Sequence, residues 1–347
     1  MFTTTIHNNN QRVDAFTFSF VNSATSSQTL TTSVGIGNTI YDNGVLIHAT
    51  PSTARNRFEY YYGSTIYNVR NTGSAAQLIL GSSSGTLIIK THKRCLTSAF
   101  DISTTSIQTG LVEMDLSGFT GLSATGSNRG ITSNNNILTD IIFPYSDTIF
   151  ISTVSGNLIN LSNSPNLTSI DMSGFHGIGG YIQGFGCPLL STIILPTSIL
   201  PDVYPIQRFY FYNTSPTGVL GPLDLSVLTN LGGDVRFQNN PLMGSIIFPN
   251  TSHRVSNINL SNCGVGYINL TPLSYSYATG SSITISANTN NISKINMNHL
   301  LVDLDNLGWT GGTLTANSGN NGYDNSGGYN GTTARTNLIS KGWTITL

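Results

Sequence analysis

The chain has 347 residues, a formal net charge of -1 and only 8% charged residues. This balance excludes the basic stripe with which proteins usually meet nucleic acid, and no apolar run in the sequence is long enough to cross a bilayer. Apolar residues make up 38% of the chain and recur periodically, which excludes a disordered protein. We therefore expect a folded protein whose solubility rests on amides and hydroxyls rather than on charge.

Residues 1–105 show short alternating segments that are typical of β-strands. Turn sequences separate them, among them Asn43-Gly44, a strong signal for a two-residue hairpin. Strands are predicted at 16–20, 39–41, 45–47, 58–62, 65–69, 77–80 and 86–90. This density of strands predicts a small antiparallel β-sandwich-like domain.

Between residues 111 and 297 one apolar motif occurs eight times. Each copy has an apolar residue, two spacers, a second apolar residue, one spacer and a third apolar residue. The copies are Leu111-Met114-Leu116, Leu138-Ile141-Phe143, Leu167-Ile170-Met172, Leu190-Ile193-Leu195, Leu220-Leu223-Leu225, Met243-Ile246-Phe248, Val265-Ile268-Leu270 and Ile292-Ile295-Met297. Self-similarity at a period of about 26 residues is typical of a solenoid, in which each repeat forms one coil.

A second strand is predicted upstream of the motif in each coil. The segments 159–161, 235–237, 258–260 and 283–285 align, and an asparagine follows each of them. These asparagines are Asn163, Asn239, Asn262 and Asn288. A buried asparagine at the same place in successive coils can bond the backbone of its own coil and of the next, so we expect a stack of buried amides.

The tail contains a Gly- and Asn-rich loop, a predicted helix over 333–340 and a predicted strand over 343–345. It can cap the last coil, which would otherwise expose a sheet edge and the core. The Leu-x-x-Leu-x-Leu motif, followed by small residues or asparagine, resembles the leucine-rich repeat. Its helix-poor, Ser/Thr/Asn-rich form resembles the BspA-type repeats of bacterial surface proteins, and the tail resembles the end of such proteins in Bacteroidetes and their phages.

The predicted fold class is therefore mostly β, in three parts. Residues 1–105 form a sandwich-like anchoring or oligomerisation domain, 106–303 a leucine-rich-repeat-like solenoid of about eight coils, and 304–347 a C-terminal cap. A right-handed solenoid is expected because parallel crossovers are almost always right-handed. The resemblance departs from the ordinary family in two ways: a helical convex side is missing, and no asparagine recurs at one strict offset.

The spacer between the last two apolar positions of each motif is expected to point to solvent, because neighbours in a strand alternate. This outer row alternates between aspartate and isoleucine before it ends in asparagine. Its members are Asp115, Ile142, Asp171, Ile194, Asp224, Ile247, Asn269 and Asn296. Two interpretations stay open. The alternation keeps like charges two coils apart, or it makes an apolar and acidic surface for another subunit or a receptor.

A second candidate surface follows Arg208, where four aromatic residues occur in a row. They are Phe209, Tyr210, Phe211 and Tyr212. In a strand two of the four would face outward, where aromatic rings suit a sugar or a partner protein. The alternative is that they pack against a neighbouring loop.

An enzyme is not expected. Glu113 and Asp115 would lie about 7 Å apart on one strand face, which is compatible with glycoside hydrolysis, but the pair recurs nowhere else. Histidines show no metal-ligand spacing, and motifs for phosphate-binding loops or catalytic triads are missing, so neither metal nor cofactor is expected. The chain has three cysteines, and Cys187 and Cys263 hold equivalent positions three coils apart, too far to bridge. Free thiols are therefore predicted, as in a protein that folds in a reducing cytosol.

The favoured function is a non-enzymatic virion surface protein, a phage spike or fibre, that is made in the host cytoplasm and presents its repeats to a host glycan or protein receptor. The first 20 residues show no classical secretion signal, which fits virion assembly in the cytosol. The N-terminal domain would contact the virion or further copies, and a homo-oligomer is expected, with neither nucleic acid bound nor a membrane entered. The alternative is a BspA-like adhesin on a bacterial cell surface. A polysaccharide depolymerase is the least favoured function.

Overall fold

The computed structural model describes residues 138–143, 157–175, 178–197, 205–213, 217–273 and 283–347, together with the backbone of the strands that precede residue 138. Within these residues the protein is mostly β, as the sequence predicts. Helix in the described ranges is confined to α2 (Lys294–Asn306) and α3 (Gly331–Ser340). Neither helix is long and apolar enough to span a bilayer.

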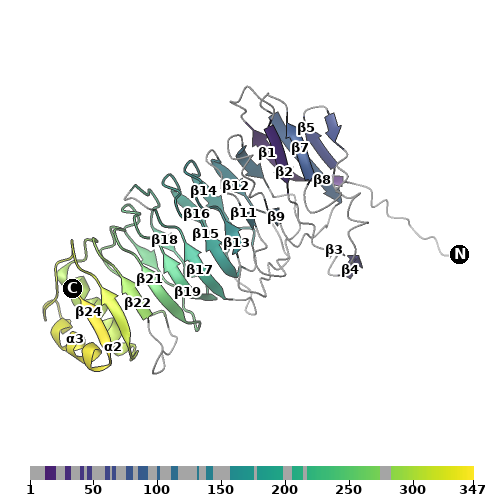
Figure 1. Ribbon diagram of the computed structural model, residues 1–347. Helices are drawn as coiled ribbons and strands as arrows, with labels where there is room; N and C mark the ends of the chain where they lie inside the picture. The colour runs from purple at the N-terminus through teal and green to yellow at the C-terminus, as the bar shows by residue number, and fades with distance from the viewer. Residues whose placement is uncertain are drawn as a thin grey trace.

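The largest sheet has ten parallel strands, and Figure 1 shows them side by side along the body. In spatial order they are β9 (Phe100–Asp101), β11 (Ile131–Thr132), β13 (Asn157–Asn160), β15 (Gly180–Gln183), β17 (Ile206–Tyr210), β19 (Leu231–Arg236), β21 (Val255–Asn259), β22 (Ile283–Ser286), β23 (Gly312–Thr315) and β24 (Trp343–Thr346). We call this the long sheet. Its strands follow one another in chain order, so each repeat adds one strand.

The apolar motif forms the strands of a second parallel run. These are β10 (Leu111–Asp115), β12 (Asp140–Ile142), β14 (Ser169–Asp171), β16 (Thr192–Ile194), and the separate pair β18 (Leu223–Asp224) and β20 (Ile246–Ile247). From β10 to β21 the chain visits this run and the long sheet in alternation. The layout explains the two apolar patterns in each repeat, because each pattern supplies one strand with a buried face.

The strands that precede residue 100 pair antiparallel. They are β1 (Arg12–Phe20), β2 (Gln28–Thr32), β3 (Ile40–Asp42), β4 (Val45–His48), β5 (Glu59–Tyr62), β6 (Thr65–Tyr67), β7 (Ala76–Leu80) and β8 (Gly85–His92). Seven of them overlap the predicted segments, and β2 was not predicted. Asp42 pairs with Val45, so the hairpin predicted at Asn43-Gly44 is confirmed. β1 also pairs with β10, so hydrogen bonding continues past residue 105. The sandwich arrangement itself stays a prediction.

The core lies between the two parallel runs. One fully buried residue per strand forms a row through the long sheet, in register from strand to strand. The row is Ile159, Ile182, Phe209, Val235, Ile258, Ile285 and Leu314. The middle apolar residues of six motif copies, Ile141, Ile170, Ile193, Leu223, Ile246 and Ile268, are buried as predicted.

The strand predicted for the eighth copy of the motif was wrong. Ile295 was expected to point inward from a strand, but it lies in the first turn of α2 and its side chain is 48% exposed. Ser293 caps this helix, because its hydroxyl accepts a hydrogen bond from the Asn296 N–H at 3.2 Å. Apolar residues three apart suit a helix as well as this motif, so spacing alone did not separate the two.

The predicted stack of buried asparagines is displaced by one residue. Asn163, Asn239 and Asn262 are not buried, and they have φ of 59°, 66° and 56°, the left-handed conformation that asparagine tolerates. Asn288 is likewise not buried, and the left-handed residue after its strand is Thr289, with φ of 55°. The prediction for these four asparagines was therefore wrong. Asn163, Asn239 and Asn262 form the turn, as Thr289 does after β22, and the buried polar group comes next in the chain after each of these four residues.

That buried group is Ser164 after Asn163, and an asparagine or a cysteine after the other three turns. Asn290 donates from Nδ2 to the carbonyl of Leu260 in the preceding repeat at 2.8 Å, and to that of Ala287 in its own repeat at 2.9 Å. Its Oδ1 accepts from the N–H groups of Cys263 and Val265 at 2.9 and 3.2 Å. One amide therefore satisfies four backbone groups, three in the preceding repeat and one in its own.

Asn240 repeats the pattern, with Nδ2 donating to the carbonyls of Phe211 and Phe237 at 2.7 Å each. At the same place one repeat later, the Sγ of Cys263 donates to the carbonyl of Phe237 at 3.2 Å. Cys187 does the same to the carbonyl of Leu161 at 3.3 Å. We call these buried amides and thiols the polar ladder. It makes each repeat depend on the backbone of its neighbour.

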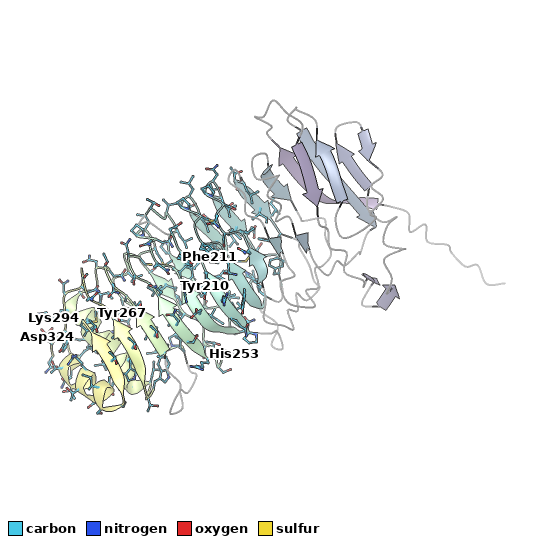
Figure 2. All side chains as sticks on the ribbon, viewed as in Figure 1. Tyr210, Phe211, His253, Tyr267, Lys294 and Asp324 are labelled. Atoms are coloured by element: carbon cyan, nitrogen blue, oxygen red, sulfur yellow. The ribbon has the colours of Figure 1, made fainter. Side chains whose placement is uncertain are left out.

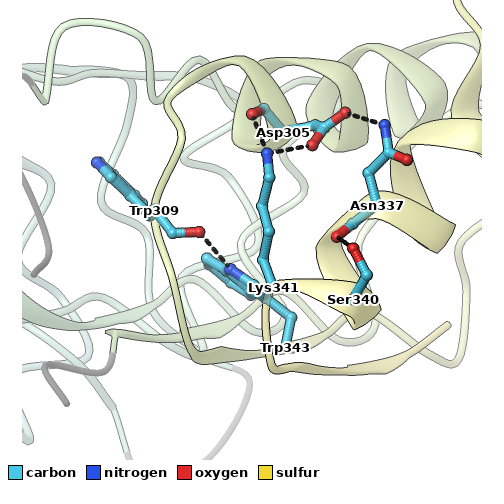
Figure 3. A network of polar contacts seen from close by, with 6 residues as sticks. All are labelled: Asp305, Trp309, Asn337, Ser340, Lys341 and Trp343. Carbon is cyan, nitrogen blue, oxygen red and sulfur yellow. Dashed lines mark hydrogen bonds and ion pairs between the residues drawn. The ribbon is translucent and has the colours of Figure 1, made fainter. Parts of the chain in front are cut away.

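The C-terminal end of the chain folds as the predicted helix and strand, α3 and β24. Figure 3 shows the contacts that join them to α2: Lys341 Nζ donates to Asp305 Oδ1 at 2.5 Å, and Asn337 Nδ2 donates to Asp305 Oδ2 at 2.8 Å. The buried Trp343 donates from Nε1 to the carbonyl of Trp309 at 3.1 Å. In the described residues these contacts cover the last apolar layer.

We predict that Asn290→Ala lowers the free energy of unfolding by about 3 kcal/mol, because buried backbone groups lose their partner. Asn291→Ala, at the adjacent exposed position, is the matched control and should change stability by less than about 0.5 kcal/mol. Asn290→Cys keeps one donor, as at Cys263, and should fall between the two. Urea unfolding followed by circular dichroism gives the three values, and equal losses in all three would contradict this role of the ladder.

The thiols give a second prediction. Burial raises the pKa of Cys187 to about 11 and that of Cys263 to about 12, and both are free. In a Cys95→Ser variant, which removes the cysteine outside the described residues, Ellman's reagent at pH 8 should find no thiol until guanidinium unfolds the chain. Because both pKa values lie above the ordinary thiol value of 9.0, the stability linked to the neutral thiols is complete below about pH 9 and is lost between about pH 9 and 12. Reaction of the folded chain at pH 8 would contradict the prediction.

Candidate binding surface

From Ile142 to Asn269 the outer row lies on the solvent side of the motif repeats, as predicted; the side chain of Asp115 lies outside the described residues, and Asn296 lies in α2 instead of a strand. Parallel pairing places Ile142 between Asp115 and Asp171, and Asp171 beside Ile194, while Asp224 pairs with Ile247. The three isoleucines are 40%, 44% and 53% exposed in chain order. Strand pairing therefore aligns acidic and apolar residues in two stretches, from Asp115 to Ile194 and from Asp224 to Ile247.

Turn chemistry explains the alternation. Asp171 Oδ1 accepts from the N–H of Ser173 at 2.8 Å, and Asp224 does the same for Ser226 at 2.8 Å. Asn269 Oδ1 accepts from the N–H of Thr271 at 3.0 Å. This is the side-chain turn that aspartate and asparagine favour.

The isoleucine repeats need no such acceptor. Two residues after Ile142, Ile194 and Ile247 stand Pro144, Pro196 and Pro249. Proline has no N–H, so a carboxylate two residues earlier would find nothing to bind. Aspartate thus accompanies serine, and isoleucine accompanies proline. Spacing of charge is therefore not needed to account for the aspartates.

The row ends at a hollow. Asn269 is exposed, whereas Asn296 lies in α2 and donates from Nδ2 to the carbonyl of Gly266 at 2.7 Å. Together with Ile247 and Tyr267 they line a hollow of about 500 Å³. The change in the row towards the C-terminus therefore coincides with a depression of the surface.

One wall of this hollow is rigid, because Tyr267 belongs to an aromatic stack. Its ring lies 4.9 Å from that of His299, which in turn lies 4.1 Å from that of Tyr329. The Tyr267 hydroxyl donates to Asp303 Oδ2 at 3.1 Å. Burial first, and then the charge of Asp303, raise the pKa of Tyr267 to about 12, so the phenol stays neutral. These contacts join the last motif repeat to α2 and to the loop before α3.

The aromatic strand β17 divides into two faces. Phe209 and Phe211 are buried, at 0% and 2% exposure, and pack against Phe237 with ring centroids 5.8 and 6.4 Å away. Including these two phenylalanines in a binding surface was therefore wrong. Tyr210 and Tyr212 alternate with them and so point away from this core. Tyr212 is half-buried, whereas Tyr210 (labelled in Figure 2) is only 7% exposed, because neighbouring side chains of the long sheet cover its ring.

Charged and aromatic residues from β15 and β19 flank the two tyrosines. Pairing in the long sheet aligns Tyr181, Arg208 and Asp234 in one outward row, and Tyr210 with Arg236 in the next. Tyr212 stacks on Phe185 beyond the strand ends, with ring centroids 5.2 Å apart. We call this set the tyrosine–arginine face: Tyr181, Arg208, Tyr210, Tyr212, Asp234 and Arg236.

The centre of the tyrosine–arginine face is a hydrogen-bonded ion pair. Asp234 Oδ2 accepts from the Tyr210 hydroxyl at 2.5 Å and from Arg236 Nη2 at 2.8 Å. The Arg236 guanidinium also lies 4.9 Å from the centre of the Tyr210 ring. Burial, and then the hydrogen bond to Asp234, raise the pKa of Tyr210, so it remains a donor. The negative charge of Asp234 is thereby neutralised within the face.

Sequence reasoning found Tyr210 and Tyr212 but missed Tyr181, Arg208, Asp234 and Arg236 as parts of a surface. The missing signal is alignment: these residues become neighbours only when the long-sheet strands, not the motif strands, are placed in register. Elsewhere in the described ranges, no group of His, Cys, Asp or Glu is suited to hold a metal ion. The side chains of Glu113 and Asp115 lie outside the described residues.

Comparison of the chain with protein-family models, with curated proteins and with solved structures gave no significant match in any of the three. Its function must therefore be argued from its own residues.

Turn chemistry leads to a prediction at one repeat. Ile194→Asp adds a carboxylate without an N–H to accept, and Pro196→Ser adds an N–H without an acceptor. The double variant recreates the Asp171 turn, so the two changes should couple favourably by about 1 kcal/mol in urea unfolding. Ile194→Leu with Pro196→Ser is the matched control, because leucine accepts no hydrogen bond. Equal coupling in both pairs would refute the explanation of the alternation.

Proposed function

We propose that the residues 106–303 form a right-handed, leucine-rich-repeat-like solenoid of the irregular BspA type, with a sandwich-like domain before it and a cap after it. Support comes from the parallel strands that the chain visits in alternation. The polar ladder supports it too: Ile258-x-Leu260-x-x-Cys263-x-Val265 has the Asn-or-Cys position that leucine-rich repeats carry after the strand.

We propose further that the protein is a non-enzymatic attachment protein, a spike or fibre on a phage virion, which binds the surface of a host cell. The tyrosine–arginine face is the observation that carries this proposal. In a chain with 8% charged residues, three charges and three tyrosines gather on adjacent strands of one sheet. Tyrosine and arginine are the residues most often found at binding hot spots.

Virion assembly in the cytosol agrees with the buried free thiols. The first domain would join the protein to the virion and to further copies of itself. The bacterial alternative, a BspA-like adhesin, would use the same face. Antibody detection on purified virions and on intact bacteria, after expression from the native gene, separates the two locations.

Attachment is tested with labelled full-length protein, intact Bacteroidetes cells and flow cytometry. We expect saturable binding that Tyr181→Ala with Tyr212→Ala weakens at least tenfold, about 1.4 kcal/mol. Ile194→Asp, on the exposed outer row of the other run, is the control and should leave cell binding and the mass by light scattering unchanged. If Ile194→Asp abolishes cell binding or lowers the oligomer mass, the outer row, not the tyrosine–arginine face, is the surface that binds the cell or the further copies.

Absence of binding to any cell, or a monomer by light scattering, would contradict a virion spike. Release of new reducing ends from host polysaccharide would show the depolymerase that we do not favour.

A further inference from the structure

The outer surface of the long sheet has a free positive charge at Arg208. Its side chain is exposed, and the guanidinium carbon lies 4.2 Å from the centre of the Tyr181 ring and 5.9 Å from that of Tyr210. Cation–π contacts act within about 6 Å, so the two rings hold the guanidinium in place. Among the described residues Arg208 forms no ion pair, because Asp234 is already engaged by Arg236 and Tyr210.

This arrangement is complementary to an anion of a particular geometry. A guanidinium offers parallel N–H donors that match a carboxylate. Arg208 covers one face of the Tyr181 ring, and Phe185 and Tyr212 cover one face of each other. The three rings are partly exposed, and their uncovered faces and edges suit the apolar faces of sugars. A single fixed cation between aromatic rings favours a carboxylate attached to a ring over a dense polyanion, which needs a row of basic residues.

Beyond Arg208 the same outward rows continue as uncharged donors and acceptors. One row passes from Arg208 and Asp234 to Asn257, Thr284 and Thr313. Strands lie about 4.8 Å apart, close to the length of one sugar in an extended chain. Amides and hydroxyls at that spacing can each meet one sugar unit, so the rows fit a polymer that runs across the strands.

A protein partner fits this face less well. Protein interfaces have an apolar core depleted of charge, whereas the described exposed aliphatic residues such as Ile142, Ile194 and Ile247 lie on the other parallel run. The charge of Arg208 next to uncharged amides thus distinguishes the long sheet from the apolar and acidic outer row.

We propose that the tyrosine–arginine face binds an acidic polysaccharide, with the carboxylate of a uronic or sialic acid on Arg208 and the neighbouring sugars on Tyr181, on Tyr212 and on the Asn and Thr rows. This inference rests on the proposed attachment function and names its receptor class.

Isothermal titration of the full-length chain tests it with defined probes: polygalacturonate, alginate, hyaluronate and polysialic acid, against methyl-esterified polygalacturonate and dextran. We expect at least one acidic polymer to bind at least tenfold more tightly than the neutral ones, and the affinity to fall with added salt. Arg208→Ala should lower that affinity at least tenfold, and Arg208→Lys should lower it less. Arg335→Ala is the matched control, since Arg335 also lies over a tyrosine ring, that of Tyr323 at 5.3 Å in the cap.

Equal affinity for the ester and the acid, or equal effects of Arg208→Ala and Arg335→Ala, would overturn the proposal. Cell binding that survives in Arg208→Ala would overturn it too. So would cell binding that is removed by protease treatment of the cells but not by periodate, because the receptor would then be a protein. Those outcomes leave attachment intact. A chain that binds an acidic polymer through Arg208 but binds no cell would keep this inference and remove the attachment function.

Discussion

The structure depends on one interaction, the bond from a buried amide or thiol to the backbone of two successive repeats. Where a long-sheet strand ends, the chain turns inward and leaves carbonyl groups away from water, which costs free energy unless a donor reaches them. Asn240 and Asn290 supply that donor across the repeat boundary. Each strand is thereby fixed in height against the previous one, so the outward rows stay in line and residues far apart in sequence form one face.

Periodicity predicted the strands well because burial acts directly on it: an apolar residue returns each time the chain returns to the core. It predicted turn residues less well. Asn239 and Asn240 are the same residue type, yet the first adopts the left-handed conformation of the turn and the second is buried. Which of two adjacent asparagines turns inward depends on backbone geometry, which no residue type encodes. The same limit explains Ile295, whose spacing fits both a strand and the helix that the Ser293 cap begins.

The binding surface was predictable only in part, for a different reason. Alternation within β17 indicates that two of four aromatic residues face outward, but the pairing of Phe209 with Val235 decides which two. The partners of the tyrosines lie one repeat away on either side. An arginine on one strand and a tyrosine on the previous strand have no local pattern in common, so only the register of the long sheet reveals that Arg208 stands beside Tyr181.

Proline in alternate repeats has a consequence for how such a surface can change. Where serine follows two residues after the row position, that position must keep an acceptor or leave an N–H unpaired. Where proline stands two residues later, as after Ile142, Ile194 and Ile247, there is no backbone N–H that the side chain must accept. Every second repeat therefore carries a site at which new side chains can be tried without loss of the turn. The outer row thus has variable positions that are separated from the ones its fold requires, and they lie on the opposite run from the proposed binding face.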